Sequence, residues 1–530
     1  MTEAAEQLKP ARVRRSFVTR SGYVASGNPD KMHASALGPE SLGNFPTAHE
    51  GARGGRRLGT WGLRGTGPNL DLELELVHLR DRCRDLVRNN SWAKGAEDTW
   101  VANAIGTGLV PRWNLDDKDL QNRLARMYRR WTKQADADGR TTFAGLQELV
   151  ARTLFSSGES LARMRPRRLT DGLRVPLQIQ VMEPDHLDGL YGASAHERAP
   201  NGNDIIMGVE FDRLGRRRRY WLTREHPGEF GATGHKIPVP ARDVLHVFRP
   251  RRPGQVRGIP EISAAIVELH ELDKYSDAEL VRKRVAALFA GFITSPEGDG
   301  AGLSGFDPDD DEPTAELEPG TLQELSPGQE INFSNPADVG TNYLPWIKQQ
   351  LREVAKGMGL TYEQLTGDLE SVNFTSLRYG MLDLRRRFEM LQQNIFAFQF
   401  CQPVTERWVD TVVAAGLLGD VTVDEDLLDQ LYDIEWIAPG YRPLDPVKET
   451  RGEVLAIQAG LDSRSDAVAR RGQDVEEIDR KNRKDLERER EQGLSYETNL
   501  GPDEDDGEGS AADREDPGEN RDDGSQPNER

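Results

Sequence analysis

The sequence predicts an α+β fold in which long helices enclose a β-rich middle, and three observations predict it. In several long stretches, apolar residues recur every three or four positions, which is the period of one helix face. Short β-branched and aromatic runs, separated by Gly and Pro, lie between residues 161 and 248. Both ends of the chain are polar and show no sustained period, so we expect the folded part to lie between them.

The amino-terminal half begins helical. Residues 1–69 are rich in Gly, Arg, Ser and Pro, which predicts a flexible basic arm. A single helix is expected over 70–104, capped by Asn69 or Asp71, and further helices are expected over 119–134 and 142–156. The β-prone runs that follow are 161–165, 177–183, 208–211, 219–223 and 244–248. The arginine cluster at 216–219 fits either a solvated hairpin turn or a contact with DNA or a partner.

A helix, an insert and a second helix follow the β-prone runs. Pro260 suits the first turn of a helix that runs to about residue 290. Residues 291–337 form a proline-rich insert with an acidic run at 307–312 and short β-prone pieces at 292–294, 322–325 and 331–333. Helix resumes over 343–357, and Gly359 suits a left-handed cap.

The segment 359–391 joins a short polar loop to a strongly patterned helix. The apolar stripe of that helix comprises Leu377, Met381, Leu384, Phe388, Leu391, Ile395 and Phe398. Its remaining apolar residues, Leu382, Phe396 and Phe400, suit the core or a contact with another subunit, and we favour the core for most of them.

The carboxyl-terminal part reads as one strand and three helices. The strand is expected at 433–437, and helices are expected from Pro446 to Ala459, after a cap at Ser463 or Ser465, and over 474–492. The charge-dense helix at 474–492 suits either an exposed helix that rests on neighbouring subunits or a solitary solvated helix. Residues 498–530 hold twelve acidic and three basic residues, a net charge of −9, which predicts a disordered acidic tail.

Composition and short motifs argue against membrane, disulfide-rich and enzymatic classes. No run of about eighteen apolar residues exists, and the basic amino terminus lacks the apolar region of a secretory signal. Cys83 and Cys401 lie far apart in helical patterns, which fits a reducing cytosol. No phosphate-binding GxxxxGK[ST] loop, dinucleotide fingerprint, nucleophile elbow, zincin motif or EF-hand loop is present. We therefore expect no enzyme activity, no cofactor and no metal site.

Five blocks, in order over roughly residues 75–490, carry a resemblance to a known family. They are Arg88–Ala93 with Asn103–Leu109, Gly158–Ser160 with Leu177–Asp185, Val244–Phe248 with Arg257–Pro260, the segment 359–391, and Trp436–Pro439 with Asp445–Pro446. Together they resemble the portal proteins of lambda-type tailed bacteriophages. The residues that the resemblance marks as structural are Arg88, Asn89, Asn90, Trp92, Gly106, Gly108, Gly158, Glu159, Gly258, Pro260, Ser376, Arg378, Pro439, Asp445 and Pro446.

The resemblance implies the portal fold, with a mainly helical wing, a β-rich middle, long stem and tunnel helices, a small α/β clip and a helical crown. The implied divisions are an arm at 1–69, a wing at 70–258, a stem helix at 259–290, a clip-like insert at 291–337, a returning stem helix at 338–360, a tunnel loop at 361–375, a long helix with the wing return at 376–440, crown-like helices at 441–495 and the acidic tail at 496–530.

A tunnel loop would need weakly attractive or repulsive walls, because each phosphate held by Lys or Arg slows the passage of DNA. The charges of 361–375 are Glu363, Asp368 and Glu370, with no Lys or Arg. We therefore expect the loop to line a DNA channel, with Glu363, Gly367, Asp368, Glu370, Ser371 and Asn373 as its characteristic residues. The alternative is an ordinary surface loop. Lysines at positions 368 and 370 are expected to stall DNA packaging.

The resemblance also implies partners and a location. It implies a twelvefold homo-oligomeric ring at one capsid vertex of the virion, assembled in the host cytoplasm, with double-stranded DNA passing through it non-specifically. The implied protein partners are the large terminase subunit, expected on the insert at 291–337, head–tail completion proteins, the major capsid protein and the scaffold. The rival interpretation is another minor capsid or scaffold protein of a tailed phage or prophage.

Overall fold

A computed structural model describes residues 62, 65–187, 198–287, 343–370, 372–443 and 445–494. For residues 285–287, Phe374 and four short strands it describes the backbone alone. The chain divides into two units, residues 1–70 and 71–530. The first contains a described antiparallel pair, β1 (Phe17–Val18) and β2 (Val24–Ala25). Apart from residues 62 and 65–69, the rest of the expected arm lies outside the described residues, as do the acidic run at 307–312, the β-prone piece at 322–325 and the tail at 496–530.

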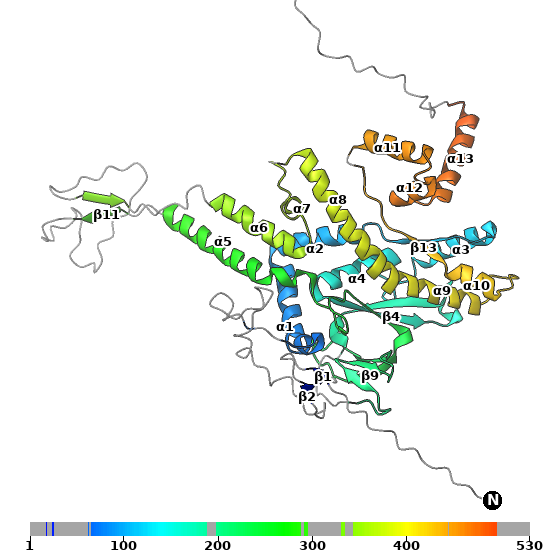
Figure 1. Ribbon diagram of the computed structural model, residues 1–530, viewed down its shortest axis with the longest axis horizontal. Helices are drawn as coiled ribbons and strands as arrows, with labels where there is room; N and C mark the ends of the chain where they lie inside the picture. Colours follow the sequence, from blue (N-terminus) through cyan, green and yellow to red (C-terminus); the bar gives the residue numbers. More distant parts are fainter. Residues whose placement is uncertain are drawn as a thin grey trace, which may run out of the picture. The chain divides into compact units, whose positions relative to one another are not determined.

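Helices dominate the second unit (Figure 1). The α-helices are α1 (Pro68–Asn89), α2 (Ser91–Ala104), α3 (Lys118–Trp131), α4 (Phe143–Ser157), α5 (Ile266–Ala287), α6 (Tyr343–Met358), α7 (Tyr362–Thr366), α8 (Phe374–Leu391), α9 (Gln402–Ala414), α10 (Glu425–Tyr432), α11 (Pro446–Gln458), α12 (Arg464–Arg470) and α13 (Val475–Gln492). Short 3₁₀-helices are η5 (Leu169–Asp171), η6 (Pro184–His186), η7 (Ala241–Asp243) and η8 (Glu261–Ala265), and η10 (Gln392–Cys401) is a π-helix. Among these described helices, none combines the length and apolar character that a membrane crossing requires.

The strands form small antiparallel sheets. They are β3 (Val110–Trp113), β4 (Glu159–Pro166), β5 (Leu177–Met182), β6 (Asp204–Ile206), β7 (Val209–Phe211), β8 (Arg217–Thr223), β9 (Lys236–Pro240), β10 (Val244–Phe248), β11 (Gly291–Thr294), β12 (Glu330–Phe333) and β13 (Ile434–Ile437). One sheet has the order β10-β4-β5 and another the order β6-β7-β8-β9, whereas β11 pairs with β12 and β3 pairs with β13. The expected combination of helices with a β-rich middle is therefore confirmed at the level of a mixed helix and sheet fold.

Local capping signals account for most of the helix starts. Thr142 caps α4 through its side chain, Ser463 caps α12 and Asp474 caps α13. The prediction of one helix over 70–104 is wrong, because Asn90 has an extended backbone and its Oδ1 accepts from the N–H groups of Trp92 and Ala93. Asn90 thus ends α1 and starts α2. Pro260 precedes η8 rather than standing inside the first turn of a helix.

The main core joins elements from both halves of the chain. Trp131 of α3 and Trp408 of α9 are fully buried, and their ring centroids lie 6.2 Å apart. Tyr128 packs edge-on against Trp408 at 5.1 Å. Strand β3 pairs with β13 in the same region, with Val110 opposite Ile437. A second, smaller core lies between the β6-β7-β8-β9 sheet and α1, where Leu72, Leu76 and Tyr220 are buried.

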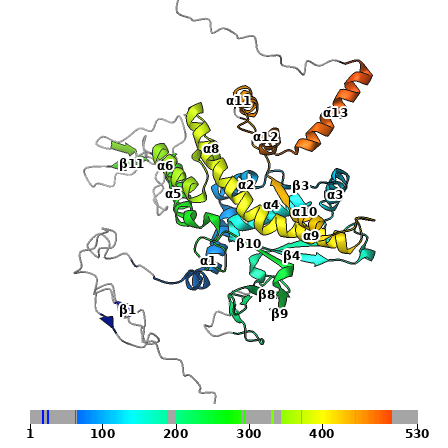
Figure 2. The same cartoon turned by 45° about the vertical axis from the view of Figure 1, so that its right-hand side comes forward.

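The long helix after the polar segment changes its hydrogen-bond period part-way. Helix α8 continues through the π-helix η10 into α9 (Figure 2). Because a π-helix bonds i to i+5, it shifts the buried stripe, so that Phe396 and Phe400 are fully buried whereas Phe398 is 72% exposed. The placement of Phe398 on the buried stripe is therefore wrong. The core interpretation is confirmed for Phe396 and Phe400, but Leu382 is exposed.

Two helices flank the insert at 291–337 and lie side by side (Figure 1). Tyr275 of α5 contacts two aromatic residues of α6, at ring-centroid distances of 4.5 Å to Trp346 and 5.9 Å to Tyr343. Strands β11 and β12 pair antiparallel within the insert, as its β-prone pieces at 292–294 and 331–333 predict. The expected order of helix, insert and returning helix is therefore present, and Gly359 has the expected left-handed backbone after α6.

The carboxyl-terminal helices are tied to the body through charged contacts. Glu476, in the first turn of α13, accepts from Lys118 Nζ at 3.1 Å and from Gln121 Nε2 at 2.8 Å. Glu477 and Lys481, four residues apart, form an ion pair at 3.2 Å along α13. Helix α13 has no buried residue. Contacts with α3 therefore hold the amino-terminal end of α13, and the rest of the helix is accessible to solvent in the single chain.

Candidate functional site

A fully buried carboxylate, that of Glu159, connects two of the sequence blocks and helix α1. Glu159 begins β4 and lies opposite Phe248 of β10. Its Oε1 accepts from Arg80 Nη2 at 2.6 Å and from Arg257 Nε at 2.8 Å. Its Oε2 accepts from Gly258 N at 2.7 Å and is 2.8 Å from His246 Nε2. One side chain therefore fastens α1, β10 and the segment before Pro260 to the central strand.

The two glycines beside this carboxylate lie back to back. Gly158 has φ +85, and a Cβ added there would overlap the backbone of Ile259 and Pro260. A Cβ on Gly258 would in turn overlap the carbonyl group of Gly158. Only glycine at both positions lets the chain segments cross this closely. Gly158, Glu159, Gly258 and Pro260, singled out in the sequence, thus meet at one crossing, which we call the Glu159 crossing.

The charges at the Glu159 crossing are fixed by their neighbours. Burial alone disfavours a charged carboxylate, but the guanidinium groups of Arg257 and Arg80 hold the pKa of Glu159 well below its usual range. Burial lowers the pKa of His246 to about 4, so its imidazole is neutral near pH 7 and its Nε2–H donates to Glu159. Every lone-pair direction of the carboxylate is therefore occupied, and the group is not available as a general base.

A second meeting point joins the amino-terminal block to the carboxyl-terminal one. A Cβ on Gly106, which has φ +50, would lie 3.1 Å from Pro439 Cγ. Gly108 packs against Ala144, and Gln147 bonds both backbone groups of Leu109, at 2.7 Å and 3.1 Å. Positive φ at both positions and the close approach of the Pro439 and Ala144 side chains explain both glycines.

The remaining marked residues are caps or surface positions. Asp445 caps α11, accepting from Lys448 N at 3.2 Å, and Pro446 is the first residue of that helix. Arg88 and Asn89 are exposed at the end of α1, and Trp92 is half-buried. Ser376 is exposed, and Arg378 Nη2 lies 3.9 Å from Glu449 Oε1.

The predicted tunnel loop contains a short helix. Thr361 accepts from Gln364 N at 3.3 Å and caps α7, and Gly367 ends α7 with φ +70. The expectation of a continuous loop over 361–375 is wrong at both ends, because α8 begins at Phe374, with Asn373 accepting from Thr375 N at 3.0 Å. The Thr-x-x-Gln pattern at 361–364 was the signal for α7. The exposed loop is therefore shorter, 367–373, and Ser371 lies outside its described residues.

The acidic residues of this segment differ in their surroundings. Asp368 Oδ2 accepts from Lys348 Nζ at 2.8 Å and from Tyr362 OH at 2.9 Å. The Lys348 hydrogen bond, with a further bond from Glu370 N, lowers the pKa of Asp368 to about 2. Glu363 is half-buried and Glu370 is exposed, beside Leu369, which is 61% exposed. The sequence indicated three equivalent acids, but Lys348, 20 residues upstream, balances one of them.

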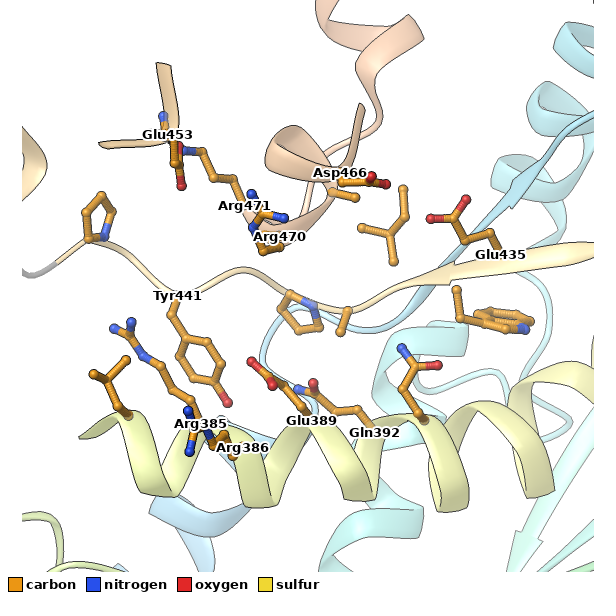
Figure 3. Close-up of a pocket in the computed structure, with 18 of the residues that line it drawn as sticks. Arg385, Arg386, Glu389, Gln392, Glu435, Tyr441, Glu453, Asp466, Arg470 and Arg471 are labelled. Atoms are coloured by element: carbon orange, nitrogen blue, oxygen red, sulfur yellow. Dashed lines mark hydrogen bonds and ion pairs between the residues drawn. The ribbon is translucent and has the colours of Figure 1, made fainter. Parts of the chain in front are cut away.

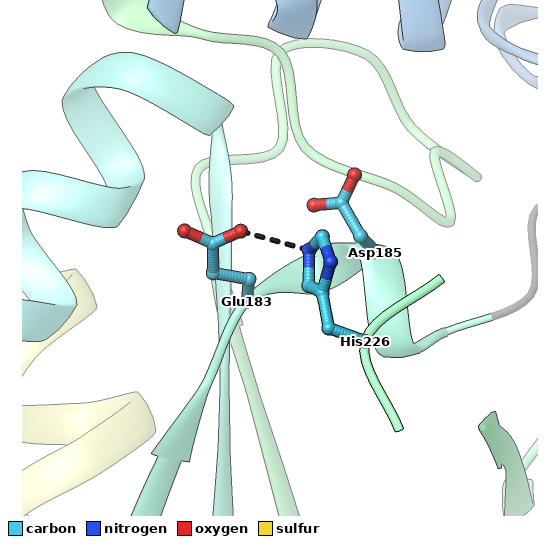
Figure 4. A group of neighbouring side chains, drawn as sticks. All are labelled: Glu183, Asp185 and His226. Atoms are coloured by element: carbon cyan, nitrogen blue, oxygen red, sulfur yellow. Dashed lines mark hydrogen bonds and ion pairs between the residues drawn. The ribbon is translucent and has the colours of Figure 1, made fainter. Parts of the chain in front are cut away.

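Within the described part of the chain, one group of side chains has metal-ligand composition: Glu183, Asp185 and His226 (Figure 4). Arg84 forms ion pairs with both carboxylates, so its guanidinium group already supplies the positive charge that a metal ion would bring. His226 Nδ1 accepts from Gly228 N at 3.0 Å, so its proton is on Nε2, which donates to Glu183 Oε2 at 3.0 Å. Both nitrogens are committed, and the group serves as an ion-pair cluster that does not fit a metal.

A cleft of about 520 Å³ lies between α8, the segment after β13, and helices α11 and α12 (Figure 3). Charged and apolar side chains both line it. Arg385 stacks on Tyr441 at 4.8 Å, and Arg471 pairs with Glu453 at 2.7 Å. These arginines are engaged with neighbouring side chains. None of the residues that line the cleft is a nucleophile paired with a base, which is the arrangement that a reaction centre would need.

Comparison with known proteins decides the family. Residues 54–392 match the family described as phage portal protein, lambda family. The chain belongs to this family. Both the Glu159 crossing and the segment 367–373 lie inside the matched residues, whereas Pro439 and Asp445 lie beyond them.

Individual relatives agree with the family assignment. A probable portal protein of Halomonas phage phiHAP-1 is 29% identical over 463 residues, covering 84% of this chain and 87% of the relative. The portal protein of Escherichia phage N15 is 24% identical, covering 84% of this chain and 91% of the relative. Portal protein B of Escherichia phage lambda is 22% identical, covering 83% and 90%. Among solved structures, the neck of an empty GTA particle aligns with a TM-score of 0.43 at 16% identity, covering 78% of this chain and 94% of that chain.

Proposed function

We propose that this chain is the subunit of a closed ring at one capsid vertex, through which double-stranded DNA is packaged and ejected. The observation that carries the proposal is the order α5, insert, α6, α7, exposed loop and α8, in a chain of the lambda portal family. Such an order gives paired helices for a stem, an insert between them and a loop backed by a long helix. The proposed role is structural and mechanical, without catalysis.

Ring formation is supported by apolar surface on the long helices. On α8, Tyr379 is 72% exposed, Met390 47% and Leu382 41%. Leu280 of α5 and Trp346 of α6 are also exposed in the single chain. Head-to-tail interfaces that close a ring cover such surface, and obligate assemblies commonly bury upwards of roughly 2,000 Å². We propose a ring of twelve copies.

The loop 367–373 is proposed to face the DNA channel. Its outward charge is that of Glu370, and none of its residues is Lys or Arg. A wall of this kind repels phosphate weakly and carries no positive side chain that would bind the phosphates of a moving duplex. Glu370→Lys in every subunit adds a ring of cations, and we expect DNA packaging to slow or stall. Packaging at the wild-type rate would contradict the channel assignment.

The proposed partners follow from the same role. We propose that the large terminase subunit docks on the insert at 291–337, and that head–tail completion proteins, the major capsid protein and the scaffold also bind the ring. The proposed location is the portal vertex of the virion, after assembly in the host cytoplasm.

The test of the assembly is electron microscopy of the purified chain, with light scattering to give the mass. Rings with a central hole wide enough for duplex DNA are the expected result. A strict monomer at high concentration would contradict the ring. It would favour instead a minor capsid or scaffold role.

A further inference from the structure

Asp368 is the point at which the exposed loop is fastened to the returning helix. The ammonium group of Lys348, on α6, donates to Asp368 Oδ2 at 2.8 Å, and Tyr362 OH donates to the same oxygen at 2.9 Å. The other oxygen accepts from Glu370 N at 3.1 Å, and Asp368 N donates to Thr366 Oγ1 at 3.1 Å. One side chain therefore links α6, α7 and the loop.

The partners of Asp368 are themselves held in place. The guanidinium of Arg352, one turn along α6 from Lys348, lies 5.4 Å from the ring centroid of Tyr362. Thr366 Oγ1 donates to Tyr362 O at 2.8 Å, which fixes the end of α7. The side chains of Lys348 and Asp368 are only 26% and 20% exposed, so water competes weakly for the pair. The bond to Lys348 lowers the pKa of Asp368 to about 2, so the carboxylate stays charged at any physiological pH.

The rest of the exposed loop is held less firmly. Leu369 is 61% exposed and Glu370 is exposed, and Val372 N forms a long bond of 3.4 Å to Leu369 O within the loop. Among the described residues from Gly367 to Val372, Asp368 is the one whose side chain forms an ion pair with α6. Loosening this one contact therefore frees the loop tip while leaving the helices packed.

We propose that the Lys348–Asp368 ion pair is a clasp that sets the position of the loop tip and transmits movement of α6 to it. Asp368 is then a positioning residue, and the charge presented to the channel is that of Glu370. This inference rests on the proposed function for its effect on DNA, but the clasp itself is a property of the folded chain. If Asp368 instead faced the channel, exchanging the charges of Lys348 and Asp368 would have a different effect on DNA packaging, which the second test below measures.

The first test compares two isosteric neutralisations in the same loop. Asp368→Asn removes the carboxylate of the clasp, and Glu370→Gln, the matched control, removes an equal charge two residues away. Hydrogen–deuterium exchange of the full-length protein, followed on peptides that cover 366–373, is expected to speed up roughly fivefold or less with Asp368→Asn, the scale of one partly exposed ion pair. Glu370→Gln is expected to leave exchange unchanged. Equal exchange in the two variants would overturn the clasp.

The second test reverses the pair and measures DNA packaging. Lys348→Asp and Asp368→Lys each place like charges together and are expected to reduce packaging, whereas K348D/D368K restores opposite charges and is expected to recover most of it. If Asp368 acted as a channel charge, the double variant would be as impaired as D368K, and that result would overturn the positioning role. If both single variants speed up hydrogen exchange over 366–373 but package DNA at the wild-type rate, the idea that the clasp transmits movement of α6 to the loop is overturned. Failure of the wild-type chain to form rings would contradict the proposed function alone, because the exchange experiment decides the clasp without DNA.

Discussion

Replacing Glu159 by Gln removes the negative charge from a site that keeps two buried arginines. Arg80 is 4% exposed and Arg257 is 1% exposed, and both bind the Glu159 carboxylate, which is 0% exposed. Removing one partner of a buried ion pair leaves an uncompensated charge and costs about 3–5 kcal/mol. A glutamine also replaces one of the two acceptor oxygens by an NH₂ group, which cannot accept a hydrogen bond. At least one of the four bonds that the carboxylate accepts is therefore lost. We expect Glu159→Gln to lower the free energy of unfolding by about 3–5 kcal/mol.

The assay is urea unfolding followed by tryptophan fluorescence at a fixed protein concentration, so that assembly contributes equally to every variant. The matched control is Glu435→Gln, because Glu435 is 49% exposed in its pair with Arg112. The control is expected to cost less than about 1 kcal/mol. If Glu159→Gln costs no more than the control, the reasoning about buried charge is refuted. Replacing Arg80, Glu159 and Arg257 together by apolar residues is expected to recover stability relative to Glu159→Gln, because no charge is then left alone.

Two further predictions concern the same crossing. Gly158→Ala is expected to lower the melting temperature much more than Gly172→Ala, because both glycines have positive φ but only Gly158 lacks room for a Cβ; similar losses in the two variants would argue against the close crossing. The pKa of His246 is lowered from 6.5 to about 4, so its neutral form favours the fold above pH 6.5. That contribution is lost as pH falls through 4, and it amounts to about 3 kcal/mol across the interval. His246→Asn, which keeps a donor toward Glu159, is expected to flatten this part of the pH dependence of the urea midpoint, and an unchanged pH profile would contradict the assignment.

Elements that depend on neighbours in sequence were predictable. The cap at Thr142, the paired strands around the insert and the helix at 343–357 all follow from local patterns, and the structure has them. The π-helix η10 was not predictable from periodicity, because the apolar spacing from Leu377 onward also fits a regular α-helix. The break at Asn90 required weighing a capping preference against a long apolar stripe, and the cap prevailed.

The contacts of the candidate sites depended on residues far apart in the chain. Glu159 lies 79 residues from Arg80 and 98 from Arg257, and nothing in the sequence links these charges. The resemblance marked Gly158, Glu159 and Gly258 without indicating that they touch. Lys348 lies 20 residues before Asp368, so the sequence alone did not place its positive charge beside the loop. Pairing across elements is a product of packing, which the local sequence does not encode.

Strand β3 completes its pairing with a segment made much later. Arg112 and Glu435 face each other across β3 and β13 although 323 residues separate them. At about 5–20 residues per second, a ribosome takes roughly 15–65 s to pass from one to the other. During that interval the edge of β3 has no partner, and Trp113, which is 2% exposed in the finished chain, lacks the contacts of β13 and α9. An unfinished chain therefore exposes a strand edge that is open to pairing with another strand, whereas β13 covers this edge in the finished chain.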